Sequence, residues 1–300
     1  MISTASEQIK SAARICGFDC VGIAASATPP FPGILRDWLA AGHHAGMRWM
    51  ERRVKEREDP FVFVPGSQSL ICVALNCYSS EPTPFPIAQY ARNVDYHLLF
   101  REKLAALVKS IKDILPECLP ITCCDTSPVL ERAYAERAGI GWIGKSSQLI
   151  SRNFGTWLLL GEVLINRELI TDQPHPNMCG LCDRCMRACP TGAIEQEYVV
   201  DCRRCLSYCT IEHRGSLPES ITGSMRGHLF GCDDCLQACP FNKFARETIE
   251  PRFKAGNHLS ALAGLPTMDE STFEQLFCKT PFMRAGLAGM KRNFAAAMVL

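Results

Sequence analysis

The chain has 300 residues, of which 47% are hydrophobic and 21% charged, and its formal net charge is +1. These values are ordinary for a globular protein of about two domains, and they exclude binding of nucleic acid through bulk positive charge. The first residues lack an apolar signal core, and the longest apolar stretch, Trp157 to Ile165, is too short to cross a bilayer. We therefore expect a cytoplasmic protein without membrane contact, whose cysteines are reduced.

Hydrophobic periodicity predicts alternating helices and strands over the first 165 residues. An amphipathic helix is predicted near residues 1–20, and a long helix begins after the N-cap Asp95 and ends at Pro116. A third helix is capped by Ser127, opened by Pro128 and runs to about residue 138. Buried strands are predicted at residues 69–75, 121–124 and 156–165. This alternation indicates an α/β or mixed α+β domain.

A glycine-rich segment, Gly139 to Ser146, matches the spacing of both the phosphate loop and the dinucleotide-binding loop. Both loops need a strand before the glycines and a long helix after them. Here a helix precedes the glycines and a strand follows them, so the context argues against nucleotide binding. Gly139 is predicted to end the preceding helix, and the other glycines to let the backbone approach something bulky and flat.

Ten of the 18 cysteines lie between Cys179 and Cys239, in two runs and a middle group. The first run, Cys179-x2-Cys182-x2-Cys185-x3-Cys189-Pro190, has the spacing of bacterial ferredoxins with 4Fe-4S clusters. The second run, Cys232-x2-Cys235-x3-Cys239-Pro240, lacks the middle cysteine, so one ligand must come from elsewhere. The candidates for that ligand are Cys202, Cys205 and Cys209.

The cysteine before each proline is expected to reach across to the other cluster, as in two-cluster ferredoxins. We assign one cluster to Cys179, Cys182, Cys185 and Cys239, and the other to Cys189, Cys205, Cys232 and Cys235. Two oxidised cubanes with their thiolates would bring the net charge to about −3. The alternative is a zinc ribbon, whose paired C-x2-C knuckles explain four cysteines but not two C-x3-C-Pro endings.

The expected domains are an α/β domain at residues 1–170, a two-cluster ferredoxin-like domain at 171–247 and a short helical segment at 248–300. The fold class is therefore predicted to be α+β. Basic residues gather in two places, from Arg48 to Arg57 and in the tail. Either group could be ordinary surface charge.

The segment Asp125 to Lys145, DTSPVLERAYAERAGIGWIGK, followed by the two cysteine runs, resembles the epoxyqueuosine reductase family. Shorter matches to the family begin at Arg57, Asp95, Arg204 and Gly231, and together they cover about residues 5–295. The resemblance implies an oxidoreductase that reduces epoxyqueuosine to queuosine at the wobble position of tRNA. The longer members of the family continue into helical repeats, so we expect a short form.

The resemblance also implies base-off cobalamin between the N-terminal domain and two 4Fe-4S clusters, whose electrons generate cob(I)alamin. The residues that it implies for the cobalamin pocket are Arg57, Asp125, Leu149, Leu160, Ser207 and Asp233. Asp125 is then the proton donor, whereas its ordinary interpretation is a helix-start aspartate. His97 is expected to be a helix-start or core histidine rather than a cobalt ligand.

The implied partners are the anticodon stem-loop of tRNA and an electron donor such as flavodoxin or ferredoxin, with the enzyme itself a monomer. The candidate tRNA contacts are His213, Arg214, Lys279, Arg284, Lys291 and Arg292. Two other functions compete with this one. A plain two-cluster electron carrier does not explain the N-terminal domain, and corrinoid reductive dehalogenases normally carry an export signal that the first residues do not show.

Overall fold

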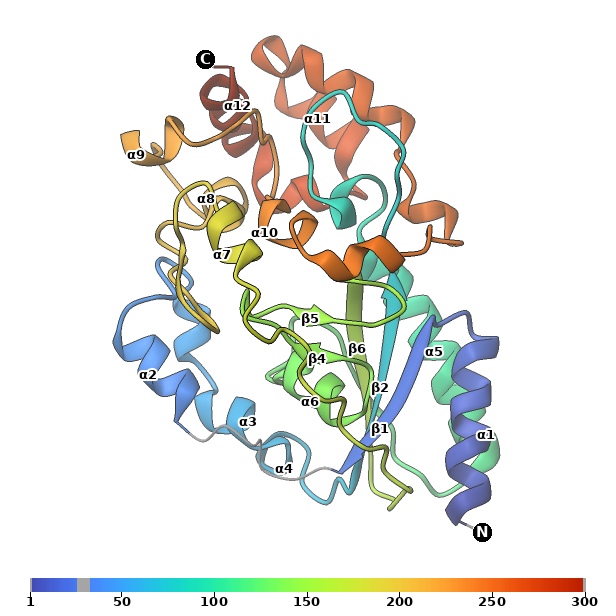
Figure 1. The fold of residues 1–300 in the computed structure, drawn as a ribbon. Coiled ribbons are helices and arrows are strands. Elements are labelled where there is room, and N and C mark those ends of the chain that lie inside the picture. Colours follow the sequence, from blue (N-terminus) through green and yellow to red (C-terminus); the bar gives the residue numbers. More distant parts are fainter. Residues whose placement is uncertain (1, 26–32, 299–300) are drawn as a thin grey trace.

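The computed structural model describes residues 2–25 and 33–298, and it is built around a four-stranded antiparallel sheet (Figure 1). The sheet has the order β1-β2-β6-β3. Its strands are β1 (Cys20–Ala25), β2 (Ser69–Asn76), β6 (Leu158–Ile165) and β3 (Ile121–Cys123). The strands predicted for β2, β3 and β6 are confirmed within two residues at each end, while β1 was not predicted.

Helices cover both faces of this sheet. Alternate residues of β2 explain why, since Ile71 and Val73 pack towards helices α1 (Ile2–Ile15) and α5 (Tyr96–Ile114), while Leu70 and Cys72 pack towards α6 (Glu131–Arg137). All eight residues of β2 are buried, which is why the strand is a continuous apolar run. The sheet and its helices therefore form the expected mixed α and β domain.

The long helix α5 confirms its predicted start, because the Asp95 side chain accepts a hydrogen bond from the backbone N–H of His97. The predicted start of α6 was wrong. Pro128 does not open this helix, which begins at Glu131 after an irregular loop. The reason lies just after β3, where Asp125 adopts a left-handed conformation (φ 56°) and turns the chain before a helix can begin.

The glycine-rich segment forms a two-stranded hairpin, β4 (Trp142–Ile143) with β5 (Leu149–Ile150). Gly139, with φ 71°, ends α6 as predicted. The prediction that the other glycines admit a bulky, flat partner was wrong for Gly141 and Gly144. A Cβ on either one would come within 2.2 or 2.4 Å of Ile150, so the close approach is to the hairpin itself.

The cysteine-rich segment that follows has only short elements. They are α7 (Arg184–Ala188), β7 (Ile194–Gln196), β8 (Val199–Val200), α8 (Leu206–Ile211), α9 (Glu219–Thr222), α10 (Asp234–Gln237) and a 3-10 turn at Pro240–Phe244. Helices α7 and α10, which carry parts of the two cysteine runs, pack against each other. Neither has a buried residue, so apolar packing does not hold this pair together.

Two further segments pack around the cysteine-rich part. Helices α2 (Ile34–Ala40), α3 (Val54–Glu58) and α4 (Pro60–Phe63), with a 3-10 turn at Arg48–Glu51, are drawn in shades of blue below α8 in Figure 1. The indole N–H of Trp38 donates to the Val200 carbonyl at 2.8 Å, and the Gly46 N–H donates to the Tyr208 hydroxyl at 2.9 Å. The N-terminal part of the chain thus contacts the cysteine-rich part directly.

The tail is helical, as predicted. It contains α11 (Glu270–Phe277), α12 (Gly286–Ala297) and 3-10 helices at Pro251–Phe253, Asn257–Thr267 and Pro281–Arg284. Its buried side chains share a core with Ile87, Ala91 and Phe230, next to the 3-10 turn Gln89–Ala91. The tail therefore joins the sheet domain to the cysteine-rich part. Among the described helices, none is long and apolar enough to span a membrane.

Candidate active site

Asp125 lies at the carboxyl end of β3 with its side chain 57% exposed. Its backbone N–H donates to Oε1 of Glu131 at 2.5 Å, which ties the loop to the first turn of α6. A left-handed conformation is unfavourable for a residue with a Cβ and persists only where the surroundings impose it. The structure therefore holds an exposed carboxyl group in a constrained loop.

His97, at the start of α5, lies between two carboxylates. Its Nδ1 is 2.7 Å from Oδ1 of Asp95, and its Nε2 is 3.4 Å from Oδ2 of Asp125. Burial alone would lower the pKa of His97, but the interactions with Asp125 and Asp95 outweigh it and raise the pKa to about 9. The imidazole is thus a cation at neutral pH and holds the Asp125 carboxylate against α5.

Arg57 supplies a second positive charge beside Asp125. Its guanidinium lies 5.6 Å from the ring centroid of Trp49, the residue is only 8% exposed, and Nε has no hydrogen-bond partner among the described residues. Burial lowers the pKa of Arg57, and the charges of Asp125 and Glu131 act against this. A buried, unpartnered guanidinium N–H fits a polar group that the chain itself does not supply.

The other predicted cobalamin contacts differ in their burial and in their contacts with the residues around Asp125. Leu149 and Leu160 are buried in the core on the α6 side of the sheet, and the Leu160 carbonyl is 3.6 Å from the Cys124 sulfur. Asp233 is buried and accepts the Gln89 backbone N–H at 2.7 Å, and burial raises its pKa to about 6. Ser207 lies in the first turn of α8. The structure links Arg57 to Asp125 and Leu160 to the Cys124–Asp125 turn, while their role as cobalamin contacts stays a prediction.

The four thiols that we assign to the first cluster lie near one another. The pKa of Cys239 is raised to about 11, mainly by burial and in addition by the nearby thiols of Cys179, Cys185 and Cys182. Cys239 belongs to the second run and its three neighbours to the first. The structure therefore brings together all four cysteines that we assign to one cluster.

The second set converges in the same way. Burial raises the pKa of Cys235 well above the usual value for a thiol, and Cys205, Cys232 and Cys189 add to this. The middle group also lies together, because Cys205 and Cys209 both raise the pKa of Cys202, and Cys205 raises that of Cys209. The assignment of Cys205 over these two stays a prediction. Four converging thiolates need a compensating cation, and iron provides one.

The spacing of these sulfurs argues against the zinc alternative. A tetrahedral zinc ion with bonds of about 2.3 Å would bring its sulfurs to roughly 3.8 Å from one another. Two groups of three side chains have all their possible ligand atoms within 4.8 Å of one another and could hold a metal ion. They are His228 with Cys232 and Asp234, and His43 with Glu195 and Asp201. Neither group contains two cysteines, so within the described residues the thiol sets are wider than a single zinc ion requires.

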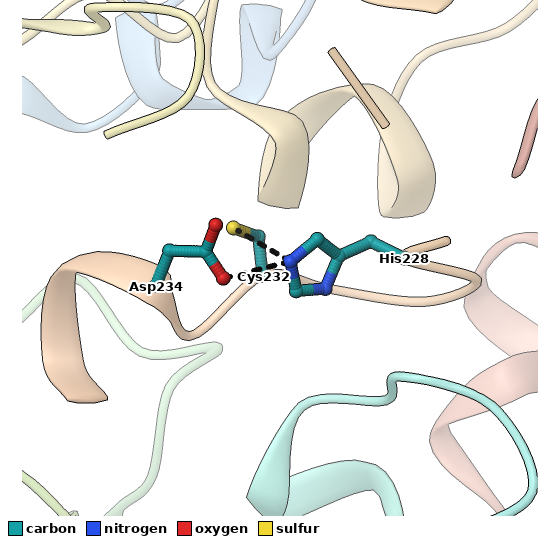
Figure 2. Close-up of side chains that lie close together, drawn as sticks. All are labelled: His228, Cys232 and Asp234. Carbon is teal, nitrogen blue, oxygen red and sulfur yellow. Dashed lines mark hydrogen bonds and ion pairs between the residues drawn. The ribbon is translucent and has the colours of Figure 1, made fainter. Parts of the chain in front are cut away.

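The first of these groups adjoins the second thiol set (Figure 2). Nε2 of His228 is 2.8 Å from Oδ1 of Asp234 and 3.8 Å from the sulfur of Cys232. Its closest contact is the carboxylate, and Cys232 already belongs to the thiol set. The group is therefore best explained as a histidine–carboxylate pair beside a cluster ligand.

The predicted tRNA contacts gather where the tail meets α8, and the structure uses them differently. Arg284 forms a bidentate pair with Glu212 at 2.7 and 2.8 Å, and Arg214 donates to the Arg284 carbonyl. Arg292 is half-buried and donates to the carbonyls of residues 209, 213 and 215. The remaining three are His213, which contacts Ser216, the exposed Lys279, and Lys291, which lies near Asp269.

Two convergent thiol sets, joined to a sheet domain that presents a constrained carboxyl group, define an iron–sulfur oxidoreductase. Residues 178–242 match the family model for a 4Fe-4S double cluster binding domain, and residues 57–126 match the model described as Epoxyqueuosine reductase QueG, DUF1730. An epoxyqueuosine reductase of Gloeobacter violaceus is 39% identical over 97% of this chain and 95% of its own length. The chain belongs to the epoxyqueuosine reductase family.

Two solved structures place the fold. A crystal structure of epoxyqueuosine reductase with an epoxyqueuosine-modified tRNA-Tyr stem loop has a TM-score of 0.91 at 26% identity, covering 98% of this chain and 81% of that one. A reductive dehalogenase structure that suggests a mechanism for B12-dependent dehalogenation has a TM-score of 0.51 at 15% identity, covering 98% of this chain and 38% of that one. The second likeness is one of fold alone.

Two carboxyl groups near Asp125 were missed by sequence reasoning. Glu131 resembles an ordinary residue in the first turn of a helix, but it holds the Asp125 backbone. Glu162 lies in β6 with no exposed surface. Its signal was visible, because an acid in the middle of the run LLLGEVLI interrupts an otherwise apolar strand.

Proposed function

We propose that the protein reduces epoxyqueuosine to queuosine at the wobble position of tRNA, using base-off cobalamin and two 4Fe-4S clusters. The observation that supports this most strongly is the nearness of Asp125 to the second thiol set. Burial raises the pKa of Tyr90, and both Asp233 and Asp125 raise it further because both carboxylates lie near its ring. Asp233 directly follows Cys232, so one partly buried tyrosine lies near both the acid and the neighbour of a proposed cluster ligand.

The reduction of the epoxide to the cyclopentene consumes two electrons and two protons and releases one water. One proton must reach the departing oxygen, and a positioned carboxyl group can supply it. Asp125 is the proposed donor, since it is exposed, constrained by Glu131 and paired with the His97 cation, which can supply the proton that the Asp125 carboxylate passes on. Two clusters, each able to store one electron, match the two-electron demand.

Cobalamin is proposed to lie between the sheet domain and the second cluster, held by Arg57, Asp125, Leu149, Leu160, Ser207 and Asp233. When bound, it supplies low-potential cobalt chemistry for the reduction. The unpartnered Nε of Arg57 is the feature of this chain that best fits such a ligand. Arg57 would then orient the ligand through its N–H groups while its charge stays balanced by Asp125 and Glu131.

The tRNA is proposed to bind along the junction of the tail with α5 and α8. The Lys279 carbonyl accepts the Asp95 N–H at 2.8 Å, so this exposed lysine adjoins the His97 and Asp125 site. Arg284 also lies near Asp125. A single-stranded loop nucleotide turned out of its stack can reach such a site. The proposed electron donor is a flavodoxin or ferredoxin, and the enzyme is proposed to act as a cytoplasmic monomer.

The test uses protein loaded with iron, sulfide and cobalamin without oxygen, a low-potential chemical reductant, and an RNA stem-loop that carries epoxyqueuosine. We expect the stem-loop to be converted to its queuosine form nearly as well as full tRNA. A brominated phenol is assayed in parallel. If protein with both clusters and cobalamin reduces no epoxyqueuosine RNA, the proposal is wrong, and release of bromide would then support the dehalogenase function.

A further inference from the structure

Glu162 is a buried acid in the centre of the sheet. It lies in β6 opposite Cys72 of β2 and Cys123 of β3, and it has no exposed surface. Neither of its oxygens accepts a hydrogen bond from an N–H or O–H group of the described residues. A buried carboxylate without partners is strongly unfavourable, so this side chain must be neutral or share a proton.

Glu131 is the polar group beside it. Helix α6 packs on β6, and the two carboxyl groups come within hydrogen-bonding reach of each other. Two carboxylates are both acceptors, so only a proton carried by one can join them. Burial raises the pKa of Glu162 well above the usual value and that of Glu131 to about 7, which places the proton on Glu162.

The other side of Glu131 faces Asp125. Its Oε1 accepts a hydrogen bond from the Asp125 backbone N–H at 2.5 Å. Asp125 has a left-handed backbone conformation, which is unfavourable for a residue with a Cβ. Such a conformation is strained and needs an interaction to hold it. The bond to Glu131 is the one that reaches Asp125 from the rigid helix α6.

We propose that Glu131 is a positioning residue that latches the Asp125 loop, and that Glu162 stays protonated and donates its hydrogen bond to Glu131. This inference rests on the proposed role of Asp125 as proton donor. The latch runs from the centre of the sheet through Glu162 and Glu131 to the loop. It fixes where the Asp125 carboxyl group points without itself contacting the substrate.

The first test measures hydrogen exchange of the Asp125 backbone amide, together with kcat and KM on the modified stem-loop. In Glu131→Met the amide loses its acceptor, so its exchange should quicken by about tenfold or more, with a kcat loss of roughly tenfold to a hundredfold and KM within about twofold. Glu136→Met is the matched control, because Glu136 lies in the same helix and accepts the Ile143 N–H at 2.8 Å. It should quicken exchange at Ile143 and leave the Asp125 amide protected.

The second test asks which form of Glu162 matters. Glu162→Gln keeps a neutral donor and should retain kcat within about threefold, whereas Glu162→Leu removes the donor and should behave like Glu131→Met. Replacing a buried carboxyl group by leucine often leaves stability unchanged or higher, so the Glu162→Leu variant is expected to fold.

Two results would overturn the latch: slow Asp125 exchange in Glu131→Met, or equal kcat in the glutamine and leucine variants of Glu162. The exchange measurement needs no turnover. It therefore tests the latch even if the wild-type protein and Glu136→Met both fail to reduce epoxyqueuosine, a failure that would count against the proposed function alone.

Discussion

The sheet domain and the cysteine-rich segment are held together by different physical means. The sheet buries a continuous run of apolar residues on both faces, and the charges at its edge, Asp95, His97 and Asp125, already pair with one another. The cysteine-rich segment has short helices without buried residues and thiols whose pKa values are raised by burial and by one another. The four-stranded sheet is therefore held by its own apolar packing, whereas the cysteine-rich segment brings together thiols that iron would join.

The strongest way to break this comparison is to remove one cluster ligand. In Cys205→Ser we expect a loss of about four of about eight irons and loss of turnover, because one cubane would have only three protein ligands. Cys202→Ser and Cys209→Ser are the matched controls and should keep both clusters. Iron and sulfide analysis of the three variants measures this. Near-normal iron in Cys205→Ser would refute the ligand assignment.

The second prediction concerns the acid of the sheet domain. Asp125→Asn keeps the loop and the shape of the side chain but removes the transferable proton, so turnover should fall by roughly a hundredfold or more. Iron content and cobalamin binding, measured by absorption spectra, should stay close to those of the wild type. Turnover within a few-fold of wild type would show that Asp125 has a structural role only.

The third prediction concerns how the stability that His97 gives to the sheet domain depends on pH. The folded-state pKa of His97 is raised to about 9, so its contribution to stability is complete below the unfolded value near 6.5 and is lost as pH rises through 9. His97→Gln removes this contribution. The difference in unfolding free energy between the two proteins should shrink by about 1 to 2 kcal/mol from pH 6 to pH 10, after allowance for partial exposure. Denaturant titrations at both pH values measure it, and a constant difference would contradict the pairing.

The smallest predicted effect distinguishes an exposed basic side chain, which can contact RNA phosphate, from one whose N–H groups already donate to backbone carbonyls. Lys279→Ala should weaken stem-loop binding and reduce the salt dependence, measured as log K against log salt, by about 0.7 to 0.9, the loss of one phosphate contact. Arg292 donates to three backbone carbonyls, so Arg292→Ala should lower stability instead and change the salt slope little. An unchanged slope in Lys279→Ala would remove this lysine from the proposed interface.

Periodicity and capping located most of the sheet domain, because β2 and α5 depend on local signals such as the Asp95 cap. The start of α6 was misplaced because the left-handed turn at Asp125 is imposed by Glu131, six residues away, and proline chemistry alone does not reveal it. Cysteine spacing proposed the thiol sets. Local sequence patterns could not show that Arg292 donates hydrogen bonds to backbone carbonyls or that the Glu162 side chain lies next to Glu131. Both depend on contacts between distant segments.

The bond between Asp233 and Gln89 has a consequence for how the enzyme matures. Cys232 is assigned to the second cluster. The next residue, Asp233, accepts a hydrogen bond from the backbone N–H of Gln89, in the segment that the tail packs against. Delivery of iron to Cys232 therefore also fixes the segment around Gln89. A chain that has received no iron would hold that segment mainly by its apolar core with the tail, and such a chain opens to proteases more readily.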